Sequence, residues 1–447
     1  ANVAAVRFGE TIDSYLSSDE VDVSDVRVEA QMARDEKLSE EVEAEGLVLV
    51  QNRGDVLPLP RDVDRVNVFG WGSTQWVGGG SGSGGVAGEC EGILQALTDE
   101  GIAYNEALAK MYRNFQGERP FLSNGSLNTH DYEFCRLYEP SVEDEGLYTP
   151  ELLQEAREYS STAIVVLSRV SGESIDCPRE QFRVTTKGGP VKRSMARHYL
   201  EPSPEEEALI RYVAANYQNV VVLVNSTNPM ELGVVESVEG VDACMLVGAT
   251  GTTGARAVVR ALWGDVNPSG RTTDTYAYDF STAPSWANAG ADGEGHYLDA
   301  GGCYPADGTL NGNVGTREAY DSVRFVDYAE GIYVGYRWYE TADAEGFWEG
   351  ERTSHGEGYD GVVQYPFGHG LSYTDFSWQV VSRDPLRGGE LDPDGSVTTV
   401  VRVTNTGSRA GKDVVELYAT PPYEHGGIEK PSTQLVAFAK TDELQPG

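Results

Sequence analysis

Along the first 275 residues, short blocks of apolar and mostly β-branched residues alternate with longer amphipathic stretches. Each apolar block has the length and composition of a buried strand, and the stretches over 91–100, 149–160 and 253–263 have helical spacing. Strands separated by helices are typical of a mainly parallel sheet with helices on both faces. The sequence therefore predicts an α/β fold, with strands at 46–50, 66–69, 163–167, 219–225 and 243–247.

One helix start is well marked. Ser203 has the residue type of an N-cap, Pro204 is suited to the first helical position, and Glu206 completes a capping box. The pattern predicts a helix beginning at Pro204.

Three other parts of the chain have a different pattern. Residues 1–45 are polar and helix-prone, so we expect a helical leader before an α/β domain over 46–275. Residues 276–375 show little helical or strand period and predict a long loop region whose aromatic stretch, Tyr328–Tyr339, packs between domains. Residues 376–447 alternate apolar and polar positions, which predicts an immunoglobulin or fibronectin III-like β-sandwich. Such a domain takes about 100 residues, so we expect this one to be incomplete.

Charge narrows the range of partners. The chain has 34 Lys and Arg against 71 Asp and Glu, a net charge of −37. Nucleic acid and anionic membranes would be repelled, whereas a neutral ligand would not. No apolar stretch approaches the length of a membrane span. The sequence is compatible with a homodimer and does not decide the oligomeric state. The five scattered cysteines predict reduced thiols and a cytoplasmic location.

The loop over residues 70–88 is the richest in glycine, and it follows a predicted strand. It lacks the third glycine of a dinucleotide fingerprint, and it has no lysine for a phosphate-binding loop. A nucleotide-dependent enzyme is therefore disfavoured. Two alternatives stay open: a flexible surface loop, or a sugar site in which Trp71 and Trp76 offer aromatic faces beside backbone amides.

A second polar loop follows the strand at 163–167. In open α/β sheets, ligands bind at the carboxyl ends of strands. Glu173 stands there beside Gly172, where the backbone can turn sharply. A general acid facing a cleft would suit this position, and a solvated surface glutamate is the plainer alternative.

Several strings in the same order resemble glycoside hydrolase family 3, the β-glucosidase family. They are Glu45–Asn52, Ser168–Asp176, Leu262–Gly270, Tyr365–Tyr373 and Val403–Gly411. Ser174 and Cys177 depart from the family's usual Gly and Arg.

The resemblance implies a retaining β-glycosidase that hydrolyses terminal β-linked sugars with Glu173 as general acid/base. It also implies a (β/α)8 barrel carrying the aspartate nucleophile. The chain has no such barrel pattern. Its Asn267–Tyr276 string resembles family members with reversed domain order, which implies a barrel after Gly447 and an isolated chain without activity.

Arg169 and Asp176 are candidates for orienting Glu173 or binding sugar hydroxyls, and a surface salt bridge is the alternative for each. The histidines show no metal-binding spacing, so we expect neither metal nor cofactor. A non-catalytic carbohydrate-binding or scaffold protein is the competing functional class.

Overall fold

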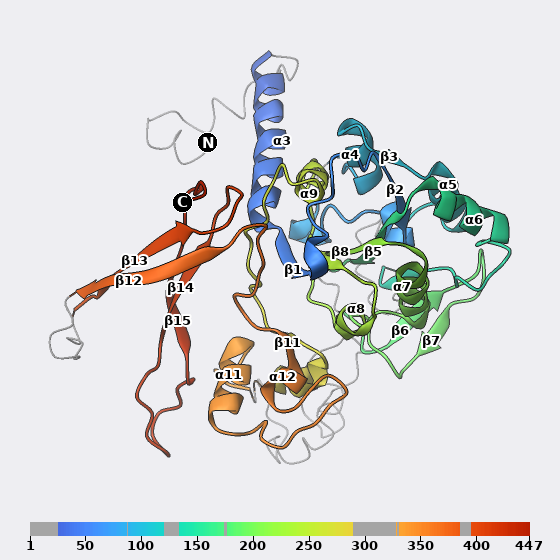
Figure 1. The fold of residues 1–447 in the computed structure, drawn as a ribbon. Helices are drawn as coiled ribbons and strands as arrows, with labels where there is room; N and C mark the ends of the chain where they lie inside the picture. Colours follow the sequence, from blue (N-terminus) through green and yellow to red (C-terminus); the bar gives the residue numbers. More distant parts are fainter. Residues whose placement is uncertain are drawn as a thin grey trace, which may run out of the picture.

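The structure is a computed structural model, and it describes residues 26–86, 88–119, 134–173, 177–288, 328, 330–384 and 395–447. Its centre is a six-stranded sheet with the strand order β1-β9-β8-β5-β2-β3 (Figure 1). The five strands from β9 to β3 pair in parallel, which confirms the mainly parallel sheet. The strands are β1 (Val48–Asn52), β2 (Arg65–Phe69), β3 (Ala103–Tyr104), β5 (Thr162–Arg169), β8 (Asn219–Ser226) and β9 (Ala243–Leu246).

Strand β1 is the exception, because it pairs antiparallel with β9. It lies at the edge of the sheet and follows directly from a helix rather than from a crossover between parallel strands. Leu371 covers this strand from outside, where its N–H donates to the carbonyl of Leu49 at 2.7 Å.

Helices cover both faces of the sheet. Successive strand side chains point to opposite faces, so Val165 packs with one helix layer and Ile164 with the other. One layer contains α4 (Ile93–Asp99) and α9 (Ala255–Leu262). The other contains α5 (Glu106–Phe115), α6 (Pro150–Tyr159), α7 (Pro204–Asn216) and α8 (Gly233–Ser237).

Helix α7 begins as the sequence predicts. The Ser203 side chain accepts from the N–H of Glu206, and the Glu206 carboxylate accepts from the N–H of Ser203. Both contacts of the predicted capping box are therefore present.

The described part of the leader is one helix, α3 (Val26–Gly46), standing beside α9 (Figure 1). The Thr253 hydroxyl donates to the carbonyl of Glu36 at 2.8 Å, and Arg260 forms an ion pair with Glu40. No helix in the described ranges is both long enough and apolar enough to cross a membrane.

Residues beyond the sheet form smaller units. A three-stranded sheet contains β4 (Arg136–Tyr138), β6 (Gln181–Val184) and β7 (Lys192–Ser194), in the order β4-β6-β7. Farther along the chain lie β10 (Tyr276–Ala277), η4 (Phe280–Thr282), η5 (Pro284–Asn288), α11 (Tyr336–Ala344), α12 (Tyr359–Val362) and β11 (Val363–Tyr365).

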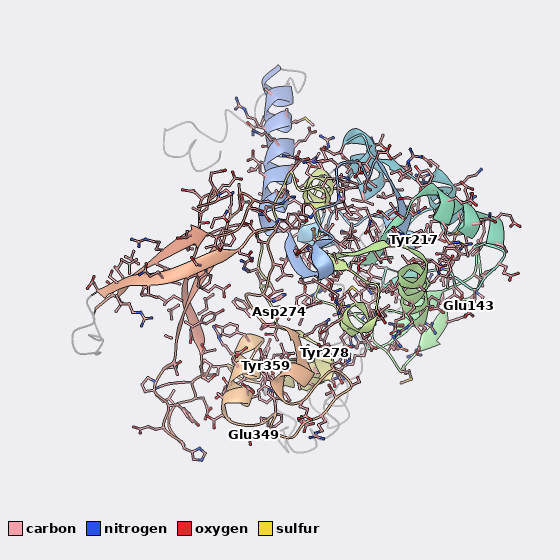
Figure 2. The ribbon with its side chains drawn as sticks, viewed as in Figure 1. Glu143, Tyr217, Asp274, Tyr278, Glu349 and Tyr359 are labelled. Atoms are coloured by element: carbon pink, nitrogen blue, oxygen red, sulfur yellow. The ribbon has the colours of Figure 1, made fainter. Side chains whose placement is uncertain are left out.

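Helix α11 lies in a stretch where we expected little helical period. Glycine and tyrosine around it obscure the spacing, and its stability comes from packing of Tyr339 and Ala342 against Trp348 and Val362. Tyr278 belongs to this unit (Figure 2), and its hydroxyl donates to Glu236 of α8 at 2.5 Å.

One residue of the aromatic stretch packs against residues later in the chain, and its role between domains stays a prediction. The Tyr336 ring lies 4.8 Å from that of Phe367 and 6.1 Å from that of Tyr418, measured between centroids. It thereby joins the middle of the chain to the C-terminal strands.

The C-terminal residues form two antiparallel ribbons, β12 (Phe376–Asp384) with β13 (Thr398–Asn405) and β14 (Val414–Ala419) with β15 (Gln434–Lys440). These small sheets are consistent with a β-sandwich-like region. Trp378, Val380 and Phe438 are 54%, 49% and 73% exposed, so the ribbons bury little of their apolar surface. The fibronectin III-like assignment and the domain boundaries stay predictions.

A buried aspartate attaches the ribbons to the α/β layers. Asp413 accepts from Arg271 at 2.6 Å, and its other carboxylate oxygen accepts from the indole N–H of Trp378 at 2.6 Å. Cys90 and Cys244 are free thiols.

Candidate active site

The two loops that the sequence singles out meet at the carboxyl ends of β2 and β5. These strands are parallel neighbours, with Phe69 opposite Val165, so their following loops leave the sheet at the same edge. Ser81 forms a bridge with Gly172, and its hydroxyl donates to the carbonyl of Glu173 at 2.9 Å.

Glycine makes this close approach sterically feasible. A Cβ at Gly172 would lie 2.3 Å from the nitrogen of Ser81, and one at Gly80 would lie 2.3 Å from the carbonyl oxygen of Ser171. The glycine-rich loop is therefore an ordered partner of the second loop in the described residues, rather than a loop that runs free over the surface.

Glu173 lies on the exposed rim formed by this contact. Its carboxylate accepts from the Ser83 hydroxyl at 2.6 Å and from the Ser83 N–H at 2.9 Å. Both hydrogen bonds favour the ionised form and hold the pKa of Glu173 below its ordinary value. Gly82 has a φ of +58°, and a Cβ there would lie 2.5 Å from the carboxylate.

The structure corrects the prediction that Arg169 contacts substrate. Its guanidinium is fully buried and forms a two-point ion pair with Glu206, at 2.8 and 2.7 Å. Its remaining N–H groups donate to the carbonyls of Ser168, Tyr199 and Glu201. No N–H of Arg169 is left for a sugar, and its salt bridge lies inside the protein rather than on the surface.

Glu206 is ionised within this pair. Burial alone would raise the pKa of its carboxyl, but the charge and hydrogen bonds of Arg169 hold that pKa below its ordinary value. The pair fixes the end of β5, from which the loop to Glu173 departs.

The structure also corrects the prediction that Trp71 binds substrate. Its side chain is only 2% exposed, its indole N–H donates to the carbonyl of Gln116, and its ring lies 4.9 Å from that of Tyr138. A sugar has no access to either face. A tryptophan suits both an exposed sugar-binding surface and a buried core position, and the sequence does not distinguish the two.

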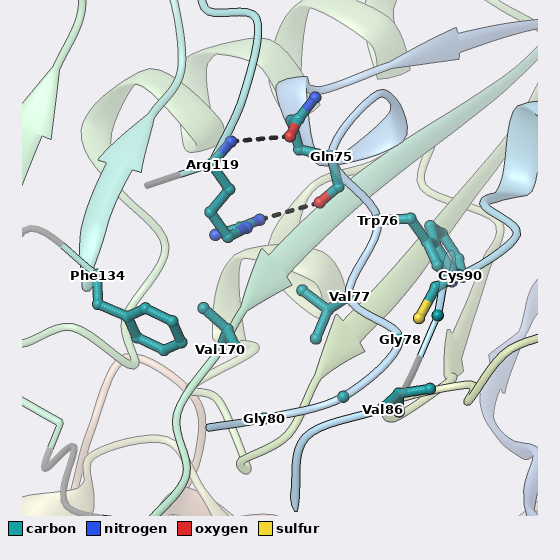
Figure 3. A pocket seen from close by; sticks show the side chains of 12 residues that line it. Gln75, Trp76, Val77, Gly78, Gly80, Val86, Cys90, Arg119, Phe134 and Val170 are labelled. Atoms are coloured by element: carbon teal, nitrogen blue, oxygen red, sulfur yellow. Dashed lines mark hydrogen bonds between the residues drawn. The ribbon is translucent and has the colours of Figure 1, made fainter. Parts of the chain in front are cut away.

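Trp76 is half-buried and donates its indole N–H to the hydroxyl of Thr250 at 2.9 Å. It lines a pocket of about 360 Å³ beneath the glycine-rich loop (Figure 3). Sugar binding by Trp76 stays a prediction.

The remaining candidate, Asp176, lies outside the described residues.

A buried polar network anchors the start of the glycine-rich loop. The Trp71 N–H donates to Glu139 at 2.9 Å, and the Gly70 N–H donates to the Tyr112 hydroxyl at 2.7 Å. Burial raises the pKa of Glu139 well above its ordinary value, whereas the hydrogen bond from the Trp71 N–H acts in the opposite direction.

One cluster of possible metal ligands is found among the described residues: His198, Glu201 and Glu231. The Leu200 N–H donates to Nδ1 of His198 at 3.2 Å, so Nε2 carries the proton and donates to Glu231 at 2.9 Å. A metal at Nε2 would require the opposite tautomer, and the cluster therefore fits a hydrogen-bonded role.

Sequence reasoning missed Ser83 and Glu206 as partners. Ser83 had one weak signal, its position between glycines, and Glu206 was identified only for its role in the capping box. Neither partnership is encoded by spacing, because each joins segments far apart in the sequence.

Fold and site together define an α/β module that presents a carboxylate at the carboxyl edge of its sheet. The model of the glycosyl hydrolase family 3 C-terminal domain matches residues 47–336. This chain belongs to that family.

Known beta-glucosidases are similar to this protein in sequence and in structure over most of the chain. A beta-glucosidase from Ruminococcus albus is 31% identical over 411 residues, which cover 91% of this chain and 34% of that protein. The structure of beta-glucosidase 3B from Thermotoga neapolitana has a TM-score of 0.63 at 28% identity and covers 92% of this chain and 47% of that one. A beta-glucosidase structure from Paenibacillus barengoltzii has a TM-score of 0.66 at 30% identity, with 92% and 37% covered. The chain thus spans between about a third and a half of these proteins' lengths.

Proposed function

We propose that this chain is the acid/base-bearing part of a retaining β-glucosidase-like enzyme that hydrolyses terminal β-linked sugars. Glu173 is the general acid/base. The aspartate nucleophile lies on a (β/α)8 barrel elsewhere in the full-length protein. The substrate is a β-glycoside or oligosaccharide, and no cofactor takes part.

The observation that carries the proposal is the position of the Glu173 carboxylate. It is exposed at the carboxyl edge of the sheet and is held by two hydrogen bonds from Ser83. A carboxylate that serves two domains has to face outward and yet keep one orientation, and this arrangement meets both needs.

In the first step, protonated Glu173 gives its proton to the glycosidic oxygen while the nucleophile bonds to the anomeric carbon and the leaving group departs. In the second step, the Glu173 carboxylate takes a proton from water as that water attacks the same carbon, which releases the sugar and the nucleophile.

Only the second step suits the carboxylate as it stands in this chain, because Ser83 lowers the pKa of Glu173. The first step needs a raised pKa, which a covering domain would supply by desolvation and by its own carboxylate. We therefore expect the isolated chain to hydrolyse no aryl β-glucoside.

The test is Glu173→Ala in the full-length protein. Hydrolysis of glycosides with poor leaving groups should fall by about 10²- to 10⁴-fold, while activated aryl glycosides lose less and recover in part with azide. Glu143→Ala removes an exposed loop carboxylate and is the matched control (Figure 2). An equal loss on all substrates without azide rescue would contradict the acid/base role.

Absence of hydrolysis by the unaltered full-length protein, combined with sugar binding by the isolated chain, would instead favour a non-catalytic carbohydrate-binding protein. The free thiols are compatible with the proposed cytoplasmic location. Cell fractionation tests that location.

A further inference from the structure

A second candidate site is a pocket lined in part by residues of the glycine-rich loop. Its volume of about 360 Å³ is in the size range of small-molecule sites. The walls are largely apolar, with Val77, Val86, Phe134 and Val170 around the opening that Figure 3 shows. Trp76 adds an aromatic wall.

Arg119 is the one cationic side chain among the described residues that line this pocket. Its Nη2 donates to the carbonyl of Gln75 at 3.1 Å and to the hydroxyl of Ser168 at 2.7 Å. The ring of Trp71 lies 4.8 Å from its guanidinium carbon. These contacts hold the guanidinium in one position.

Within the described ranges, no carboxylate forms an ion pair with Arg119, and its Nε and Nη1 donate to no protein acceptor. Burial lowers the pKa of Arg119, as expected for a cation that lacks a counter-charge. A guanidinium stays charged at neutral pH, so an acceptor of negative charge would be stabilised beside it.

We propose that this pocket binds a small ring-shaped organic monocarboxylate, whose carboxylate accepts from Arg119 and whose ring lies against Trp76 and the valine side chains. A single cation matches a single negative charge. The mostly apolar wall matches a ring better than it matches inorganic phosphate, and no lysine is found among the described residues that line the pocket. This site is separate from the proposed acid/base role of Glu173.

The test titrates the purified chain with benzoate, with glucuronate and with the neutral isostere benzamide, followed by calorimetry. At least one of the two carboxylates should bind with a Kd below about 1 mM. If benzoate is that ligand, benzamide should bind about tenfold or more weakly. Glucuronate distinguishes a sugar ring from an aromatic one within the same ligand class.

Arg119→Gln should weaken carboxylate binding at least about tenfold, and Arg119→Lys should weaken it less. Arg113→Gln is the matched control, because it removes an equal charge from an exposed position on α5 and should leave binding unchanged. Val86→Phe fills the pocket without touching a hydrogen bond of Arg119, and it should abolish binding with an unchanged melting temperature.

If Arg119→Gln fails to fold, carboxylate binding by Val86→Phe tests the proposal instead. The proposal is overturned if neither carboxylate binds, if phosphate binds more tightly than both, or if Val86→Phe binds as the unaltered chain does.

Discussion

The carboxylate of Glu173 is held by Ser83, a residue that precedes it by 90 positions, through the hydroxyl at 2.6 Å and the backbone N–H at 2.9 Å. The glycine-rich loop thus places a hydrogen-bond donor pair on the candidate acid/base. This relationship makes the protonation of Glu173 depend on a loop of the same module.

Ser83→Ala tests that dependence. The variant removes the hydroxyl but keeps the N–H, so the pKa of Glu173 should rise toward its ordinary value. Carbon-detected NMR titration of the glutamate carboxyls measures the change, and Ser83→Thr, which keeps a hydroxyl, should reproduce the unaltered titration. An unchanged pKa in Ser83→Ala would show that the hydroxyl bond does not persist in solution.

Gly172→Ala tests the contact between the two loops. The new Cβ would lie 2.3 Å from the nitrogen of Ser81, so the loops must separate at a cost of about 1–3 kcal/mol. Urea unfolding and amide exchange of residues 80–83 measure the effect. The control is Gly84→Ala, because a Cβ there meets no atom within 4 Å. Equal stability of the two variants would contradict the loop contact.

Glu206→Gln tests the buried ion pair. It leaves the Arg169 guanidinium without a counter-charge inside the protein, so we expect a loss of about 3–5 kcal/mol in the free energy of unfolding. Replacing Asp265 by Asn breaks the exposed pair with Arg61 and should cost less than about 1 kcal/mol. Urea unfolding measures both losses. Similar losses would contradict the expectation that the Arg169–Glu206 pair is buried and the Arg61–Asp265 pair is exposed.

Glu43→Gln tests a pH effect at helix α3. Burial raises the pKa of Glu43 to about 8, and its Oε1 is buried without a hydrogen-bond partner. The folded chain therefore binds this proton more tightly than the unfolded chain does. Stability should fall as the pH rises from about 4.5 through about 8, by at most about 5 kcal/mol in total.

Melting temperatures between pH 5 and pH 9 measure that fall, which Glu43→Gln should reduce. Glu41→Gln, at an exposed position on the same helix, should keep the dependence of the unaltered chain. A Glu43→Gln curve parallel to the unaltered one would contradict the prediction.

The sequence predicted what local pattern encodes. The strand at 163–167 and the capping box at Ser203 are both found, because apolar runs and cap chemistry act within a few residues. Helix α5 was not predicted, although Asn105 caps it, and neither was the antiparallel direction of β1.

Site residues were predicted less well, because their roles depend on burial. Glu173 lies on an exposed rim, as the pattern of strand and polar loop suggested. Arg169 is the last residue of β5 and Trp71 comes two residues after β2, yet both side chains turn inward, and their residue types suit either direction. The contact of Glu173 with Ser83 required two loops to meet in space, which no sequence period describes.

The hydrogen bond between Leu371 and Leu49 has a consequence for handling the protein. It occupies the outer border of β1, where an uncovered strand would offer its backbone to a second molecule. A deletion of residues 363–375 would uncover this border and would also remove Tyr365 and Tyr373 from the core, so the shortened polypeptide should polymerise through strand pairing at β1.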